Sequence, residues 1–283
     1  MGIPKGFIFS QSSLQDFVDC WRRFQLRYLK HLSWPAIETE PVLEAEHTMQ
    51  QGALFHRMVH QHLRGVPTAR LQRMVAGDDL ARWWANYLVL HQEMEETGIL
   101  SGKVFVEERL SAALAGVRLQ AQFDLVVVLP DSTVRIYDWK TGPRLGKPHP
   151  QRRYLAERLQ TRLYPYVLAR AGAQLNAGQS LTPEKVELIY WFAGQPGLPE
   201  RFTYNLQAYQ QDELYLSELI ETIQRLGEGD FSLTLDEQRC IYCVYRSLCE
   251  RGARAGDIAD ADGDFDGGLS LDVNFEQIEE IEF

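Results

Sequence analysis

The stretch VRLQAQFDLVVVLPDSTVRIYDWKTG, residues 117–142, indicates which kind of fold the chain adopts. It contains two runs rich in β-branched and aromatic residues, separated by a Pro-Asp turn. A third run of this kind, VFVEERLSAAL at 104–114, precedes it across an Ala-Gly turn. Such runs, bounded by turn residues, are typical of consecutive strands. The pattern therefore predicts a three-stranded antiparallel meander.

Helical patterns surround this meander. Apolar residues recur at helical spacing after Ser12 and Ser13, so we expect Cys20 to lie on a first helix. The same periodicities predict helices at about 41–63, 78–97, 152–170 and 206–226, and strands at 185–193 and 201–205. The order is helices, then sheet, then helices.

The end of the meander, RIYDWKTG at 135–142, contains a candidate catalytic pair. Residues two apart on a strand share a face, so Asp138 and Lys140 project together and Trp139 points to the opposite face. The pattern D-x-K is very common, and the alternative is an ordinary surface hairpin with an Asp and a Lys side by side.

Asp124 on the preceding strand is expected to join this pair. If Leu129 and Val134 close the hairpin turn, Asp124 lies opposite Trp139, one residue away from Asp138. With one residue of register slack, the two carboxylates meet at one end of the hairpin. An oxygen-rich site of this kind suits a hard divalent ion such as Mg²⁺. A lysine beside the ion can orient or help deprotonate a water, as phosphodiester hydrolysis requires.

Three further features favour a catalytic site. The sequence GALFH at 52–56 lies on an expected helix, where Gly52 permits close backbone approach and His56 can reach a metal. On the helix after the hairpin, Gln160 and Tyr164 share one face. Between the hairpin and that helix, basic residues gather of the kind that a phosphate backbone needs. They are Arg144, Lys147, His149, Arg152 and Arg153.

The acidic residues are unevenly distributed. The chain has 283 residues and a net charge of −10, which at first argues against a nucleic-acid partner. Ten of the 39 acids lie in 255–283, where there is no Lys or Arg, so the remainder holds 29 acids and 29 basic residues. We therefore predict a folded body at 1–254 and a largely disordered acidic tail at 255–283. The tail either solubilises the protein or binds a protein partner.

The four cysteines form one upstream residue and a C-x₂-C-x₅-C group: Cys20, Cys240, Cys243 and Cys249. No signal peptide or membrane span is evident, which predicts a cytoplasmic protein without membrane contact. In a reducing compartment, clustered thiols favour a metal or redox site over disulfides. Four thiolates accept either Zn²⁺ or an iron–sulfur cluster.

Taken together, these residues resemble the PD-(D/E)XK nuclease superfamily, in particular its branch of RecB-type, AddB-type and Cas4-like nucleases. The resemblance covers roughly residues 8–252. It is strong because the motifs occur in the family's order. The motifs are GALFH at 52–56, Asp124, DWKTG at 138–142, Gln160 with Tyr164, and the four cysteines. The chain departs from the family at Ala121, where glycine is frequent, and at Trp21, where proline is frequent after the first cysteine.

The resemblance implies a restriction-endonuclease-like α/β core, with a central mixed sheet flanked by helices. It implies a DNA nuclease that depends on Mg²⁺ or Mn²⁺, an exonuclease of single-stranded DNA or duplex ends in repair and recombination. Metal ligands would be His56, Asp124, Asp138 and the backbone carbonyl of Trp139. Lys140 would serve the water, Gln160 and Tyr164 would complete the site, and Arg144, Lys147, Arg152 and Arg153 would bind DNA. Glu107 or Glu108 is a further candidate to support the metal.

The same resemblance favours a [4Fe–4S] cluster over Zn²⁺ at the four cysteines, which would tie the first helix to the end of the body. No phosphate loop is present, since Gly146-Lys147 is followed by Pro148, so a helicase partner would be another chain. Two alternatives stay open: a Cas4-like role in CRISPR spacer acquisition with an adaptation protein as partner, and a non-catalytic module that binds DNA or a protein.

Overall fold

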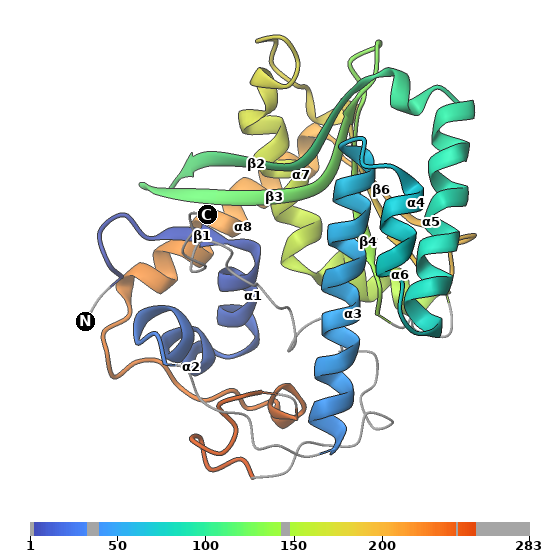
Figure 1. Ribbon diagram of the computed structural model, residues 1–283. Coiled ribbons are helices and arrows are strands. Elements are labelled where there is room, and N and C mark those ends of the chain that lie inside the picture. Colours follow the sequence, from blue (N-terminus) through green and yellow to red (C-terminus); the bar gives the residue numbers. More distant parts are fainter. Residues whose placement is uncertain (1–2, 33–39, 143–147, 242, 253–283) are drawn as a thin grey trace, which may run out of the picture.

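The sheet at the centre of the molecule has six strands and mixed direction (Figure 1). The computed structural model describes all residues except 1–2, 33–39, 143–147, 242 and 253–283. Its strands are β1 (Ile8–Ser10), β2 (Lys103–Leu114), β3 (Val117–Val128), β4 (Val134–Lys140), β5 (Val186–Phe192) and β6 (Glu200–Thr203). They follow the order β1-β3-β4-β5-β6, and β2 pairs with β3. β1 is parallel to β3 and β4 to β5, and the other neighbours are antiparallel.

Helices pack on both faces of this sheet (Figure 1). They are α1 (Gln11–Asp19), α2 (Trp21–Phe24), α3 (Glu40–Leu63), α4 (Thr68–Leu71), α5 (Asp78–Glu96), α6 (Pro148–Glu157), α7 (Leu159–Ala171) and α8 (Leu206–Arg225). Short 3₁₀ or π turns lie at Gln25–Leu29, Gln72–Met74, Ile99–Ser101, Gly172–Gln174, Pro183–Lys185 and Glu237–Cys240. α3 and α5 cover one face, and α1, α7 and α8 cover the other. Within the described ranges, no helix is long and apolar enough to cross a membrane.

The predicted antiparallel meander is confirmed as β2, β3 and β4. Its second turn differs from the prediction, because Val128 and not Leu129 pairs with Val134. This shifts the register by one residue. Continued past the last ladder pair, the observed register places Asp124 opposite Asp138, so no slack is needed to bring the two acids together.

β2 and β3 change faces halfway along their length. The odd-numbered residues of 119–123 face the core under α7, but on 126–128 the even-numbered residues face it. The change occurs at Asp124, whose in-register neighbour on β2 is Glu107, and this pair is missing from an otherwise continuous ladder. Glu107 has a φ of 53°, in the left-handed region. The hairpin is therefore kinked where the first acid of the candidate site lies.

The helix expected at 152–170 is divided into α6 and α7. Arg158 lies between them with a ψ of 139°, an extended conformation that interrupts the helical hydrogen bonds. The prediction of one helix was wrong because Leu155, Leu159 and Leu163, all buried, continue the helical spacing across the break.

Cys20 does not lie on a helix, contrary to the prediction. It joins α1 to α2 in an extended conformation, with φ −163° and ψ 113°. The apolar spacing continues on both sides of this residue, since Phe17 and Phe24 are both buried, and therefore conceals the break.

The segment after α8 returns to the N-terminal helices, below α2 in the view of Figure 1. The rings of Phe24 and Phe231 are stacked with centroids 6.2 Å apart. The Tyr245 hydroxyl donates a hydrogen bond of 2.8 Å to the Leu32 carbonyl. The two ends of the described body are thus joined by contacts that do not involve cysteine.

Candidate active site

Two strands on the same edge of β3 leave a gap at Asp124. β1 pairs with residues 118–120 of β3, and β4 pairs with residues 125–128. In the gap, the Asp124 Oδ2 accepts a hydrogen bond of 2.8 Å from the Trp139 backbone N–H. The Asp124 side chain thus takes the place of the backbone acceptor that the next ladder pair would supply. It keeps the end of β4, including Asp138, beside Asp124.

Asp138, Lys140 and Gln160 form a triangle of polar contacts. The Lys140 Nζ lies 3.0 Å from the Asp138 Oδ2 and donates to the Gln160 Oε1 at 3.0 Å. The Gln160 Nε2 donates to the Asp138 Oδ1 at 2.5 Å. Alternation along β4 puts the acid and the lysine on the face that α7 covers. The structure therefore brings together three of the predicted site residues.

His56 reaches the site from α3. Its Nδ1 lies 3.3 Å from the Asp124 Oδ1. The helix comes close to the end of β4 at Gly52, where a Cβ would lie 2.7 Å from the Thr141 Oγ1. A side chain at this position would press on Thr141, so glycine permits the approach that brings His56 to the acid.

The charges at His56 and Asp124 stabilise each other. Burial alone would lower the pKa of His56, but the Asp124 carboxylate, with smaller contributions from Asp138 and Glu107, raises it to about 9. Burial would raise the pKa of Asp124, but the His56 charge and hydrogen bonds from His56 and the Trp139 N–H lower it below the usual range. Without a bound metal ion, His56 is therefore protonated at neutral pH, and it supplies a positive charge among the acids.

Glu107 is a third acid at this site. Burial and the nearby Asp124 charge raise its pKa, and the charges of His56 and Asp138 also act on it. Its Oε2 accepts a hydrogen bond of 2.6 Å from the Gln122 Nε2. Glu108 instead occupies a regular ladder position. Of the two glutamates considered from the sequence, Glu107 is the one at the site.

Tyr164 lies one helical turn after Gln160 on α7. Its ring packs against that of Phe123, with centroids 5.0 Å apart. Burial and the charges of Asp138 and Asp124 raise the pKa of its hydroxyl well above the usual value. The hydroxyl therefore stays protonated and remains a hydrogen-bond donor.

Trp139 contributes its backbone rather than its side chain. The indole packs in the opposite core, with its ring centroid 6.2 Å from Tyr87 and 5.8 Å from Trp191. The role predicted for its carbonyl stays a prediction.

The predicted DNA-binding residues are placed in part. The Arg152 Nη1 donates to the Arg201 carbonyl at 2.8 Å, and the guanidinium lies over the Phe202 ring at 4.5 Å, so Arg152 contacts β6. Arg153 is exposed on α6. Arg144 and Lys147 lie outside the described residues, as does the acidic tail at 255–283.

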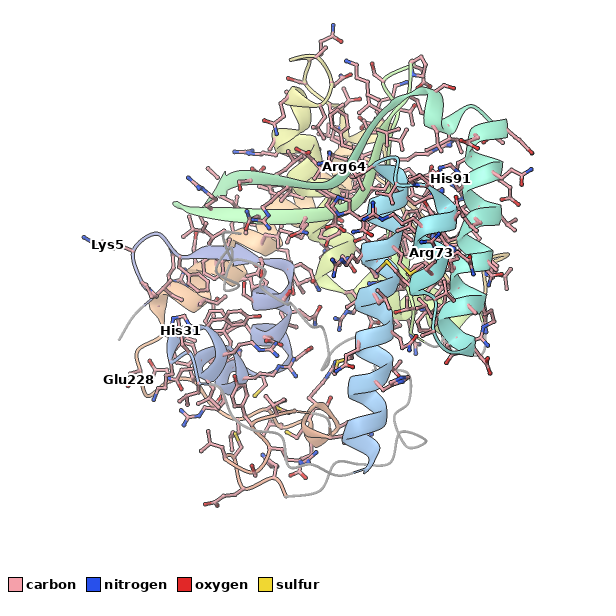
Figure 2. All side chains as sticks on the ribbon, viewed as in Figure 1. Lys5, His31, Arg64, Arg73, His91 and Glu228 are labelled. Carbon is pink, nitrogen blue, oxygen red and sulfur yellow. The ribbon has the colours of Figure 1, made fainter. Side chains whose placement is uncertain are left out.

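The four cysteines line one pocket, between the α1–α2 junction and the segment after α8. Figure 2 shows sulfur atoms in this region, below α2. All four are free thiols. Burial and the neighbouring thiols raise the pKa of Cys240 to about 11. Three arginines share the pocket wall: Arg23, Arg239 and Arg246.

Beneath this pocket lies a buried ionic network that the sequence analysis missed. The Arg23 Nε lies 2.7 Å from the Asp16 Oδ1, and its Nη2 lies 2.6 Å from the Asp19 Oδ2. Arg27 adds a contact of 2.8 Å to Asp16. The available signal was the alternation of acids and arginines at three- and four-residue spacing, which favours ion pairs along a helical segment.

The donor set at the active site suits a hard divalent cation. Carboxylates of Asp124, Asp138 and Glu107 offer oxygen, and His56 offers an imidazole nitrogen. As they stand, no three or more His, Cys, Asp or Glu side chains in the described part of the chain are arranged to hold a metal ion. The carboxylate oxygens instead accept the hydrogen bonds from Gln160 and Trp139. A cation would take over these oxygens.

Comparison with known proteins gives a family and two solved structures. The sequence model of the PD-(D/E)XK nuclease superfamily matches residues 8–250. The structure of SSO0001 is 14% identical in sequence, with 88% of each chain covered and a TM-score of 0.42. A "putative exonuclease" from Eubacterium rectale is 13% identical, with 81% of this chain and 84% of that chain covered and a TM-score of 0.49. No curated protein matches the sequence.

Proposed function

Because the chain belongs to the PD-(D/E)XK nuclease superfamily, we propose that it hydrolyses phosphodiester bonds of DNA with Mg²⁺ or Mn²⁺ as cofactor. The contacts among Asp138, Lys140 and Gln160, beside the pair of His56 and Asp124, carry this proposal. These contacts bring together residues of α3, the β3–β4 hairpin and α7, which the proposed hydrolysis needs in one place.

Each residue has a distinct part in the proposed reaction. His56, once it has lost its proton, would hold the cation together with Asp124 and Asp138, and the Trp139 carbonyl would be a further oxygen donor. When bound, the cation neutralises phosphate charge and lowers the pKa of water. Lys140 orients the attacking water, and its own ammonium is kept in place by Asp138 and Gln160.

Tyr164 and Gln160 complete the site on the side of α7. The protonated Tyr164 hydroxyl donates a hydrogen bond toward the phosphate, which favours the extra negative charge that develops during attack. Gln160 fixes the relative positions of the acid and the lysine.

We propose that the substrate is a single strand or a duplex end, cleaved by an exonuclease in DNA repair or recombination. The side chains of His56 and Asp124 are 31% and 16% exposed, so a backbone phosphate can approach them. Arg153, exposed on α6, contributes positive charge toward that backbone. Arg144 and Lys147 are further candidates from the sequence.

For the second site we propose a [4Fe–4S] cluster bound by Cys20, Cys240, Cys243 and Cys249, with Zn²⁺ as the alternative. All four thiols line one pocket. The arginines of the pocket wall offset the negative charge that four thiolates would concentrate there. A broad visible absorption band from iron–sulfur charge transfer in protein purified without oxygen would support the cluster, and zinc alone in elemental analysis would support the alternative.

A nuclease assay with labelled single-stranded DNA and Mn²⁺ tests the main proposal. Lys140→Ala should lower the cleavage rate by about 100-fold or more, since it removes the group that orients the water. Lys185→Ala, at an exposed lysine before β5, is the matched control and should cleave like the original protein. Equal cleavage by Lys140→Ala and the control would refute the assignment.

A further inference from the structure

A continuous line of buried polar contacts connects the cysteine pocket to the active site. Arg23 lines the pocket and lies 2.6 Å from the Asp19 Oδ2. The Gln15 Nε2 donates to the Asp19 Oδ1 at 2.9 Å. The Gln15 Oε1 accepts a hydrogen bond of 3.1 Å from the Leu159 backbone N–H. The next residue is Gln160, which contacts the active-site acid and lysine.

The contact from Gln15 serves as the cap of α7. Leu159 is the first residue of this helix, and N–H groups in a first turn have no partner within their own helix. The residue before it, Arg158, makes no capping hydrogen bond with its side chain. Gln15 supplies the acceptor from α1, at a sequence separation of 144 residues. The position of the first turn of α7 therefore depends on α1.

Burial prevents water from replacing these contacts. Gln15 is 6% exposed, and Asp19 and Arg23 are each 5% exposed. A buried polar group that loses its partner pays the full cost of desolvation. A displacement of Asp19 must therefore move Gln15 with it.

Asp19 is contacted by two cations from the pocket wall. The first is Arg23, which lines the pocket together with Cys243. The second is Arg239, whose Nη1 lies 3.3 Å from the Asp19 Oδ1. A change of charge inside the pocket would thus act on Asp19 through both arginines.

We propose that Gln15 is a positioning residue, which transmits the arrangement of the cysteine pocket to Gln160 and so keeps Gln160 in contact with Asp138 and Lys140. The inference rests on the proposed function for the identity of the active site and for the metal group in the pocket. Loss of that group would leave Arg23 and Arg239 without an anion on the pocket side, which would let Asp19 shift and the first turn of α7 loosen.

Amide hydrogen exchange in the first turn of α7 tests the path without a nuclease assay. Gln15→Leu removes the acceptor of the Leu159 N–H, and exchange at this amide should quicken about fivefold or more. If Leu prevents folding, Gln15→Met keeps the length of the side chain and makes the same test. Unchanged exchange would overturn the proposal.

Gln25→Leu is the matched control. Gln25 is 1% exposed, and its Nε2 donates to the Glu228 carbonyl at 2.7 Å, so the variant loses a buried glutamine contact that does not lead to α7. Exchange at Leu159 should equal that of the original protein. Equal quickening in both variants would mean general loosening and would overturn the proposal.

Removal of the metal group tests the link to the pocket. Treatment with a chelator, with iron and zinc measured before and after, should quicken exchange at Leu159 in the original protein but add nothing in Gln15→Leu. A similar quickening in both would show a route that bypasses Gln15 and would overturn the proposal. Protein that purifies without iron or zinc would contradict both the proposed metal group and the transmission from it.

Kinetics separate positioning from stability. With Mn²⁺ and single-stranded DNA, Gln15→Leu should lower kcat roughly 10-fold and change KM less than about twofold. Added to Gln160→Leu, it should cause no further loss, because its effect acts through Gln160. An independent loss in the double variant would overturn the proposal. If the original protein cleaves no DNA, the proposed function fails, and the exchange result still decides on Gln15.

Discussion

The amide of Gln160 determines how the lysine and the acid at the site face each other. It donates to Asp138 and accepts from Lys140, and a carboxamide can do both at once. Without it, acid and ammonium would form a simple ion pair with several nearly equivalent orientations. Gln160 selects one of them, and it thereby fixes the direction of the ammonium.

The pKa of His56 predicts how the stability of the metal-free protein depends on pH. It rises from 6.5 to about 9 on folding, so the folded protein binds this proton more tightly than the unfolded chain does. The resulting stabilisation is complete below a pH of about 6.5 and disappears as the pH rises through about 9. Urea unfolding in EDTA at several pH values, for the original protein and His56→Gln, measures it. The difference in free energy of unfolding should shrink across this range, and a constant difference would contradict the assignment.

At the scale of elements, the kink in the β2–β3 hairpin places the first acid. A left-handed residue other than glycine costs about 1–2 kcal/mol, and Glu107 adopts this conformation in the middle of a strand. Because both strands change faces there, Asp124 is directed into the gap between β1 and β4. In a regular hairpin the alternation of side chains would run unbroken through Asp124, and the acid would face one of the two cores rather than the gap.

The kink predicts opposite effects of glycine at two adjacent glutamates. Glu107→Gly removes about 1 kcal/mol of backbone strain, which offsets the lost contact with Gln122, so the free energy of unfolding should stay the same or rise. Glu108→Gly, at a regular ladder position, should lower it by about 1 kcal/mol. Urea unfolding of both variants measures the two effects. Equal destabilisation would argue against a strained Glu107.

Elements with strong local periodicity could be predicted from sequence, and those set by distant contacts could not. The meander, α3, α5 and α8 follow from alternation or helical spacing. β1 consists of three residues whose partner strand is more than 100 residues away in sequence, and no local pattern indicates it. The hairpin register was wrong by one residue because the turn, rather than the strand pattern, sets the pairing.

The site residues divide in the same way, into those that a local pattern predicts and those that depend on distant contacts. Alternation puts Asp138 and Lys140 on one face, and helical spacing puts Gln160 and Tyr164 together, so these pairs were predictable. Gln15 could not be identified from the sequence, because its role is to accept a hydrogen bond from the first residue of another helix. That contact is visible only when the two helices have been placed in space.

At the scale of the whole molecule, the two ends of the described body are joined by contacts that are independent of the cysteines, Phe24 with Phe231 and Leu32 with Tyr245. The metal group proposed for the pocket of four thiols would add a second connection. Loss of that group should therefore weaken the protein without unfolding it.

Cys249→Ser tests this second connection. It should reduce the iron content and lower the melting temperature by about 5 °C or more, because a bound metal group contributes to folding stability. Leu248→Ser, at an adjacent side chain that is 37% exposed, is the control and should leave both quantities nearly unchanged. An unaltered melting temperature and iron content in Cys249→Ser would contradict the proposed role of the pocket.

The long reach between the two ends also has a consequence during synthesis. Tyr245 and Leu32 are 213 residues apart, so a ribosome adding about 5–20 residues per second makes the first partner roughly 10–40 s before the second. In that interval Phe24 lacks the Phe231 ring, against which it is stacked in the finished protein. The nascent chain thus carries an aromatic segment around Phe24 that is still incompletely covered. Its yield in a cell depends on how well that segment is shielded from other chains while translation is completed.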